Sequence, residues 1–186
     1  MSPTNSPKQI ATNKLCLQLR GSMRVEPMPI ENWIAAGADV NAYDERGVTP
    51  LHYAAYGAAS TDADIETLLD YGADVNARSR DGGTSLMAAA SVGRVGAVRI
   101  LLSRGANVNE ANGNHAEGDP WRTALSIAQE QMRRYQSWGS PLAESYGEVI
   151  RLLLSAGATS PPEPPVPEPE SYPPEPPEDG PRLLLS

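Results

Sequence analysis

A five-residue motif recurs along this sequence at nearly constant intervals, and it constrains the fold more than any other feature. Gly-Ala-(Asp/Asn)-Val-Asn occupies residues 37–41, 72–76 and 105–109, and a shortened form, Gly-Ala-Thr, occupies residues 157–159. The intact copies begin 35 and 33 residues apart. Repeats of this length are typical of solenoids, in which each unit is stable only when it is stacked on its neighbours.

The residues that precede each motif predict two short helices. Thr49-Pro50 is a helix-start signal, and Leu51, Ala54 and Ala55 follow at the i, i+3, i+4 spacing of one helix face. The small alanines predict that a neighbouring helix approaches closely.

The second apolar stripe, Ile65, Leu68 and Leu69, has the same spacing, with Asp62 as the expected cap and Gly72 as the terminator. Such short helices are marginal alone in water, so they must stack on copies of themselves.

The stretch that contains both apolar stripes has the pattern of a known family. Residues 44–77 read Asp44-x-x-Gly47-x-Thr49-Pro50-Leu51-His52-x-Ala54-Ala55 and then Leu68-Leu69-x-x-Gly72-Ala73-Asp74-Val75-Asn76-Ala77. This pattern is similar to that of the ankyrin-repeat proteins, and the resemblance covers about residues 15–159. It implies an all-α fold, an ankyrin-repeat solenoid of about four stacked helix–turn–helix repeats with β-hairpin or turn fingers at the joints.

The resemblance divides the chain into segments. We expect a disordered N-terminal segment over residues 1–13 and an ankyrin-repeat domain over residues 14–159. The domain would comprise an N-terminal capping repeat (14–43), repeats at 44–77 and 78–110, and a divergent C-terminal repeat (111–159). In the capping repeat, Leu15, Leu17 and Leu19 suggest a degenerate first helix. In repeat three, Met87 stands where His52 stands in repeat two, so we expect repeat three to be the less stable.

The C-terminal repeat carries two insertions. One enlarges the finger at residues 112–121, and the other lengthens the connection between the helices, with the first helix expected to run to Ser137. Insertions in repeat proteins gather in loops on one face, which is often the binding face.

Residues 160–186 form an acidic, proline-rich tail that we expect to be disordered. Residues 161–181 contain eleven prolines and six acidic residues. This composition favours an extended polyproline helix, and it leaves two interpretations open: a solubilising spacer, or a ligand for a proline-binding domain at 161–181.

Composition bears on location and assembly. The net charge of −8, the single cysteine and the absence of a long apolar run predict an intracellular, cytoplasmic protein with no membrane contact. We expect a monomer.

The sequence gives little sign of catalysis or of nucleic-acid binding. The family resemblance assigns His52 a hydrogen-bonding role, and Cys16 has no neighbours typical of a reactive thiolate. His115, Glu117 and Asp119 lack zinc-like spacing, so we expect no metal site and no cofactor. An arginine-rich stretch in repeat three is interrupted by acids, which favours a solvated helix face over a phosphate-binding one.

The remaining hypothesis is a non-enzymatic scaffold or adaptor that binds a partner protein through finger tips and first helices. The alternative is an inhibitor or immunity-type protein that blocks a partner's active site with the 112–121 loop. Carried over from the family, the predicted binding residues are Tyr43, Glu45, Arg46, Val48, Tyr56, Arg78, Arg80, Asp81, Ser91, His115, Trp121, Arg122 and Glu130.

Overall fold

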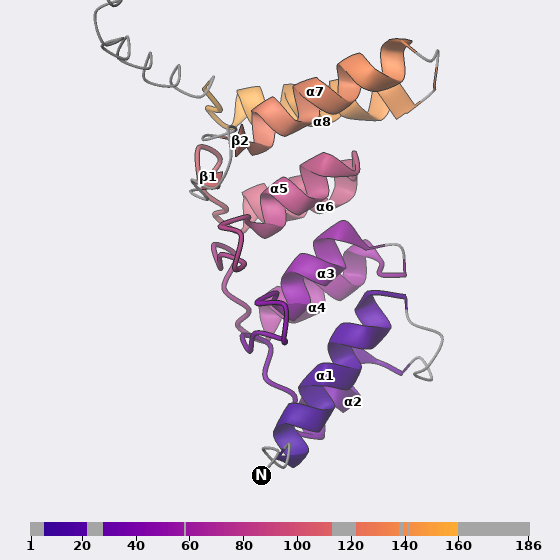
Figure 1. The fold of residues 1–186 in the computed structure, drawn as a ribbon, viewed down its shortest axis with the longest axis vertical. Helices are drawn as coiled ribbons and strands as arrows, with labels where there is room; N and C mark the ends of the chain where they lie inside the picture. The colour runs from indigo at the N-terminus through magenta and orange to yellow at the C-terminus, as the bar shows by residue number, and fades with distance from the viewer. Residues whose placement is uncertain are drawn as a thin grey trace, which may run out of the picture.

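Within the described residues of the computed structural model, four pairs of helices stack in a single row (Figure 1). The structure describes residues 6–21, 28–57, 59–112, 122–137, 140 and 142–159. The pairs are α1 (Pro7–Leu19) with α2 (Ile30–Ala35), α3 (Pro50–Tyr56) with α4 (Asp62–Asp70), α5 (Ser85–Ser91) with α6 (Val95–Ser103), and α7 (Ala124–Ser137) with α8 (Leu142–Ser155). First helices contact first helices along the row, and second helices contact second helices, so two helical layers result.

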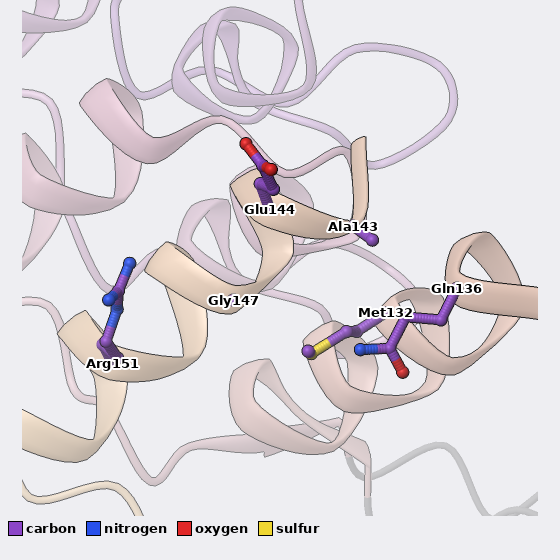
Figure 2. Close-up of a pocket in the computed structure, with 6 residues that line it drawn as sticks. All are labelled: Met132, Gln136, Ala143, Glu144, Gly147 and Arg151. Carbon is purple, nitrogen blue, oxygen red and sulfur yellow. The ribbon is translucent and has the colours of Figure 1, made fainter. Parts of the chain in front are cut away.

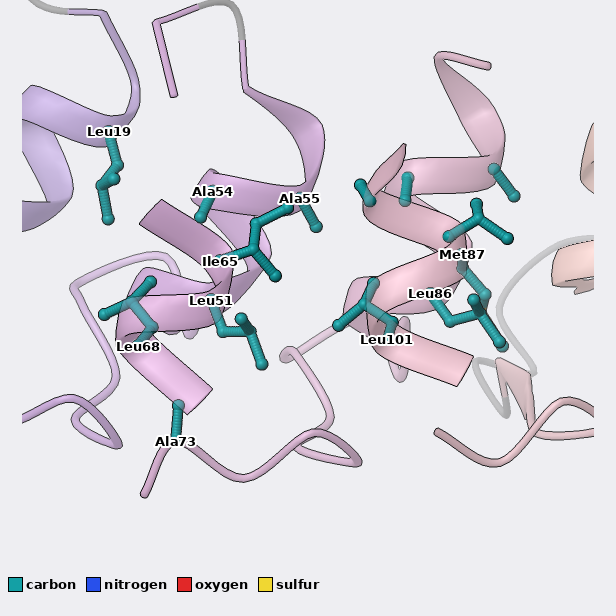
Figure 3. Close-up of a cluster of buried hydrophobic side chains, with 14 of the residues drawn as sticks. Leu19, Leu51, Ala54, Ala55, Ile65, Leu68, Ala73, Leu86, Met87 and Leu101 are labelled. Carbon is teal, nitrogen blue, oxygen red and sulfur yellow. The ribbon is translucent and has the colours of Figure 1, made fainter. Parts of the chain in front are cut away.

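The core lies between these layers and continues from one pair to the next. Leu51 and Ala54 of α3 and Ile65 and Leu68 of α4 are completely buried, as the apolar stripes predict (Figure 3). Because alanine adds only a methyl group to the helix surface, neighbouring first helices approach closely at these positions. Equivalent stripes in the other pairs belong to the same apolar cluster.

The helix starts differ in detail from the prediction. Thr61, rather than Asp62, caps α4, and its hydroxyl and the Asp64 carboxylate satisfy each other's backbone N–H groups in a capping box. Thr49 precedes α3 as expected, but its hydroxyl bonds to the His52 ring instead of a backbone N–H. Gly72 ends its repeat with a φ of +83°, as predicted.

The fingers are mostly tight turns. In the first complete one, the Asp44 carboxylate accepts hydrogen bonds from the N–H groups of Arg46 and Val48, both at 2.9 Å. Gly47 adopts a φ of +71°, and its carbonyl accepts a hydrogen bond from the N–H of Arg80 in the next finger. Paired strands occur in the last finger, where β1 (Ala111–Asn112) lies antiparallel to β2 (Arg122–Thr123).

An asparagine in each copy of the recurring motif connects its repeat to the next. The Asn41 side chain donates to the carbonyl of Gly72 and accepts from the N–H of Asp74, at 2.9 and 2.8 Å. Asn76 makes the equivalent pair of bonds to Gly105 and Asn107. These bonds fix the angle between successive pairs, because each asparagine bridges two backbone groups of the following turn.

The last of these asparagines makes the same connection across a much longer stretch of chain. Asn109 donates to the carbonyl of Gly157 and accepts from the N–H of Thr159. Both insertions of the C-terminal repeat fall between these partners.

The prediction of disorder over residues 1–13 is wrong from Pro7 onward, because these residues belong to α1. Ser6 caps the helix and Pro7 occupies its first turn. Leu15 and Leu19 are buried against the core, whereas Leu17 is exposed. The proline-rich tail at 160–186 lies outside the described residues, and within those residues no helix has the length and apolar character needed to cross a bilayer.

Candidate protein-binding groove

A groove of about 320 Å³ lies where the fingers meet the first helices. Its walls come from four elements and two fingers, so it exists only because consecutive repeats are stacked. The lining residues are mostly apolar or aromatic, with a polar edge at the fingers: Val48, His52, Tyr53, Tyr56, Ser79, Asp81, Gly83, Thr84, Met87, Ala88, Asn112 and Ile127.

The finger turn holds Tyr53 in the wall of this groove. The Tyr53 hydroxyl donates to the second carboxylate oxygen of Asp44 at 2.7 Å, while the first oxygen holds the turn itself. Burial and the hydrogen bond to Asp44 raise the pKa of Tyr53 to about 12. The ring is therefore a neutral donor fixed to its own finger, and its aromatic face remains available to the groove.

His52 joins two repeats and is held as a neutral ring. Its Nδ1 lies 2.8 Å from the Thr49 hydroxyl, and its Nε2 lies 3.0 Å from the carbonyl of Gly83 in the next finger. A carbonyl only accepts, so Nε2 carries the proton and Nδ1 accepts from Thr49. Burial lowers the pKa of His52, which favours this neutral state. Because both ring nitrogens are engaged, His52 has a structural role.

Comparison with known proteins identifies the repeats. A family model described as ankyrin repeats (3 copies) matches residues 28–112. Residues 28–112 of this chain are therefore ankyrin repeats. Ankyrin repeats are in general modules of protein–protein interaction and not enzymes.

Two relatives of the ankyrin-repeat chain come from Drosophila melanogaster. The transient receptor potential channel pyrexia is 38% identical over 96 residues, which is 51% of this chain and 10% of that protein. The Neurogenic locus Notch protein is 42% identical over 82 residues, which is 43% of this chain and 3% of that protein. The chain thus spans a tenth or less of these relatives.

The structure brings three of the predicted ankyrin surface residues together in the groove: Val48, Tyr56 and Asp81. Tyr56 is 59% exposed, so it does not simply cover the joint between repeats. Among the described residues, Asp81 is the acidic residue that lines the groove, and it makes no ion pair there.

Four other predicted residues, Tyr43, Glu45, Arg46 and Arg80, are exposed on the fingers beside the groove without lining it. Glu45 and Arg46 line a separate hollow of about 260 Å³ between the first finger and α1. Arg46 and Arg80 are exposed and are not ion-paired within the described residues.

Four predicted residues make contacts within the domain. Arg78 pairs with Glu110 and donates to the carbonyl of Ala111, so it braces the last finger. Arg122 and Glu130, both predicted surface residues, pair with each other.

Ser91 also contributes to the domain itself. Its hydroxyl donates to the carbonyl of Ala88, and its own carbonyl accepts from the Tyr146 hydroxyl at 2.9 Å. His115 and Trp121, with most of the 112–121 loop, lie outside the described residues.

Sequence reasoning missed part of the groove, above all Tyr53, Met87, Ala88 and Ile127. One signal was available: Tyr53 and Tyr56 lie three residues apart on α3, which places them on the same helix face. Ile127 has no comparable local signal, because it joins the lining through stacking of α7 on α5.

Four arginines of repeat three, Arg78, Arg94, Arg99 and Arg104, form ion pairs with carboxylates. Arg94 and Asp62 pair at 2.8 Å, as do Arg104 and Asp70. Within the described segments, no group of three or more His, Cys, Asp or Glu side chains is placed to hold a metal ion. The Cys16 thiol is buried, and burial raises its pKa to about 12.

Proposed function

We propose that this ankyrin-repeat protein is a scaffold or adaptor that binds one partner protein through the groove between its fingers and first helices. The observation that carries the proposal is a groove lined by aromatic and apolar residues, in which Tyr56 is 59% exposed and Asp81 lies at the finger edge. Tyrosine and arginine are enriched at binding hot spots, since they combine a large contact area with directional hydrogen bonds.

The groove's chemistry defines the partner segment that it fits. Val48, Met87 and Ile127 offer an apolar floor, which suits a bulky apolar side chain. Asp81 at the finger edge suits a neighbouring lysine or arginine, and Arg46 and Arg80 beside the groove suit acidic groups further along. The expected ligand is therefore an amphipathic segment with an apolar anchor.

Paired substitutions test the assignment. Changing Arg46 and Tyr56 together to alanine should weaken capture of the partner at least about tenfold, because Tyr56 lines the groove and Arg46 lies on the finger that contributes Val48 to it. The matched control changes Arg99 and Tyr71, which have similar exposure but lie on second-helix elements outside the groove. Titration of each variant with the purified partner measures the effect, and circular dichroism checks the fold.

The control pair should bind like the unaltered protein. Equal loss of affinity in both pairs would place the binding surface elsewhere.

A second candidate function, inhibition of a partner's active site by the 112–121 loop, has one supporting observation. The β1–β2 pairing and the 3.0 Å bond from the N–H of Arg122 to the Asn112 side chain close the base of this insertion. An insertion with a fixed base can enter a cleft at modest entropic cost. Deletion of residues 113–121 should abolish inhibition while binding through the groove is retained.

A further inference from the structure

The outer side of the last helix pair carries a hollow that the proposed groove does not use. One side of α7 and α8 packs on α5 and α6, whereas the opposite side is the end of the row (Figure 1). A hollow of about 510 Å³ lies there, with Met132 and Gln136 from α7 and Ala143, Glu144, Gly147 and Arg151 from α8 (Figure 2). We call these residues, together with Leu154, the end face.

The end face has an apolar centre that earlier repeats bury. Leu154 occupies the position in its helix that Leu69 and Leu102 occupy in α4 and α6. Those two leucines are half-buried against the core cluster, because another helix pair follows them. Leu154 is 51% exposed, and Gly147 beside Met132 leaves the floor open. A solenoid end needs a cover for such a surface.

The rim of the end face carries charges of both signs, those of Arg133 and Arg151 and those of the carboxylates of Glu144 and Glu148. Arg133 follows Met132 and precedes Gln136 by three residues, so it lies on the same side of α7. It is exposed and is not ion-paired within the described residues. The Arg151 side chain is 75% exposed and shares Glu148 with Arg99. The carboxylates of a segment docked on the end face would lie within reach of Arg133 and Arg151.

The C-terminal tail has the charge, length and composition to cover this surface. It continues from Thr159, which Asn109 holds beside the end of α8. Residues 161–181 contain six acidic residues and eleven prolines, and Leu183, Leu184 and Leu185 follow. The 14 residues of α8 span about 21 Å. At about 3.1 Å per residue, about seven polyproline residues reach that far, so the roughly 24 residues from 160 to 183 can run along α8 and still return to Leu154.

We propose that residues 160–186 fold back along α8, with Leu183–Leu185 on the apolar centre of the end face and the tail's carboxylates beside Arg133 and Arg151. Proline-rich chain is already extended, so docking it costs less entropy than docking a flexible segment. The tail would then act as an internal cap for the solenoid.

Disulfide trapping in the full chain tests the contact. One variant carries Leu154→Cys and Leu184→Cys. The matched control carries Ser145→Cys and Leu184→Cys, because Ser145 belongs to the same helix but lies on the side of α8 opposite Leu154. The native Cys16 is buried, so it does not compete in the folded protein. Mild oxidation should close the intramolecular disulfide about tenfold faster in the Leu154 variant than in the control.

Equal rates in the two variants would overturn the proposal, as would a disulfide formed mainly between two molecules, which would mean that a second copy covers the end face. A measurement without new cysteines serves as a check. Changing Leu183, Leu184 and Leu185 to serine should raise amide-hydrogen exchange in α7 and α8 several-fold and leave α3 and α4 unchanged. Unchanged exchange in α7 and α8 would also refute the proposal.

Discussion

Replacing Arg94 with methionine is expected to lower the free energy of unfolding by about 2–3 kcal/mol. The Arg94 side chain is only 19% exposed, and it connects the start of α6 to the segment 54–62, which lies 32 to 40 residues earlier in the sequence. Its Nη1 donates to the carbonyl of Ala54 at the end of α3, at 2.6 Å, and to the Ser60 hydroxyl at 3.4 Å. Its Nη2 pairs with the Asp62 carboxylate at 2.8 Å.

The magnitude follows from these contacts. A hydrogen bond from a charged donor contributes about 1.5–3 kcal/mol, and Arg94 supplies such a bond to a carbonyl at the end of α3. The ion pair adds less than about 1 kcal/mol, because Asp62 is half-exposed and water screens the attraction. Methionine keeps much of the aliphatic contact of arginine, so the loss reports mainly on the polar contacts.

Urea denaturation followed by circular dichroism measures the change, with Arg99→Met as the control. Arg99 belongs to the same helix, but it is 63% exposed and its nearest carboxylate lies 3.9 Å away. The control should cost less than about 0.5 kcal/mol. If Arg94→Met and Arg99→Met destabilise the protein equally, Arg94 does not connect the repeats in the way that the geometry indicates.

Three further changes test other parts of the fold. Ser85→Ala should stabilise the protein by about 1 kcal/mol, because the buried Ser85 hydroxyl lacks a hydrogen-bond partner among the described residues; a loss in thermal denaturation would contradict this. Since the folded pKa of His52 is lowered from 6.5, its contribution to stability is complete above that pH and declines as the pH falls through it. His52→Gln should flatten the stability–pH curve there, and an unchanged slope would assign the dependence to other groups. Asn76→Ala should cost about 1–2 kcal/mol in urea denaturation by removing the bonds to Gly105 and Asn107, with Asn76→Asp intermediate because it keeps the acceptor oxygen; equal stability of all three proteins would argue against the connection.

The central helix pairs could be predicted because their signals are local. The spacing of Leu51 and Ala54 indicates the buried face of α3, and that of Ile65 and Leu68 indicates the buried face of α4. A glycine with positive φ then ends each repeat. Each of these features lies within a single turn or two of helix, where sequence spacing alone fixes which side chains share a face.

The start of α1 could not be predicted in this way, because distant residues stabilise it. The Thr12 hydroxyl accepts the N–H of Asp39, and the Gln18 side chain accepts from both the N–H of Met28 and the indole of Trp33. These bonds tie a polar helix to the next helix of its pair and to the first recurring motif. The sequence of residues 7–13 therefore has the composition of a disordered segment and the structure of a helix.

Only part of the groove could be predicted, because some of its lining residues are placed by contacts with distant residues. Finger residues such as Val48 and Asp81 follow from the repeat pattern, but Tyr53 reaches its position through Asp44, nine residues earlier, and Ile127 through packing between repeats. The role of Arg94 was also missed, since its partner carbonyl lies 40 residues away. Contacts between residues so far apart in the sequence cannot be predicted from the spacing of neighbouring residues.

The hydrogen bonds that join Asn109 to Gly157 and Thr159 hold the end of the last repeat in the same place, whatever the length of the chain between these residues. Lengthening a loop raises the entropic cost of closing it only logarithmically, so extra residues between these fixed points are tolerated cheaply. The segment 113–121 and the connection between α7 and α8 can therefore accept foreign sequence without shifting the helices that precede and follow them. In an engineered version, these two sites would display new recognition loops on an unchanged frame.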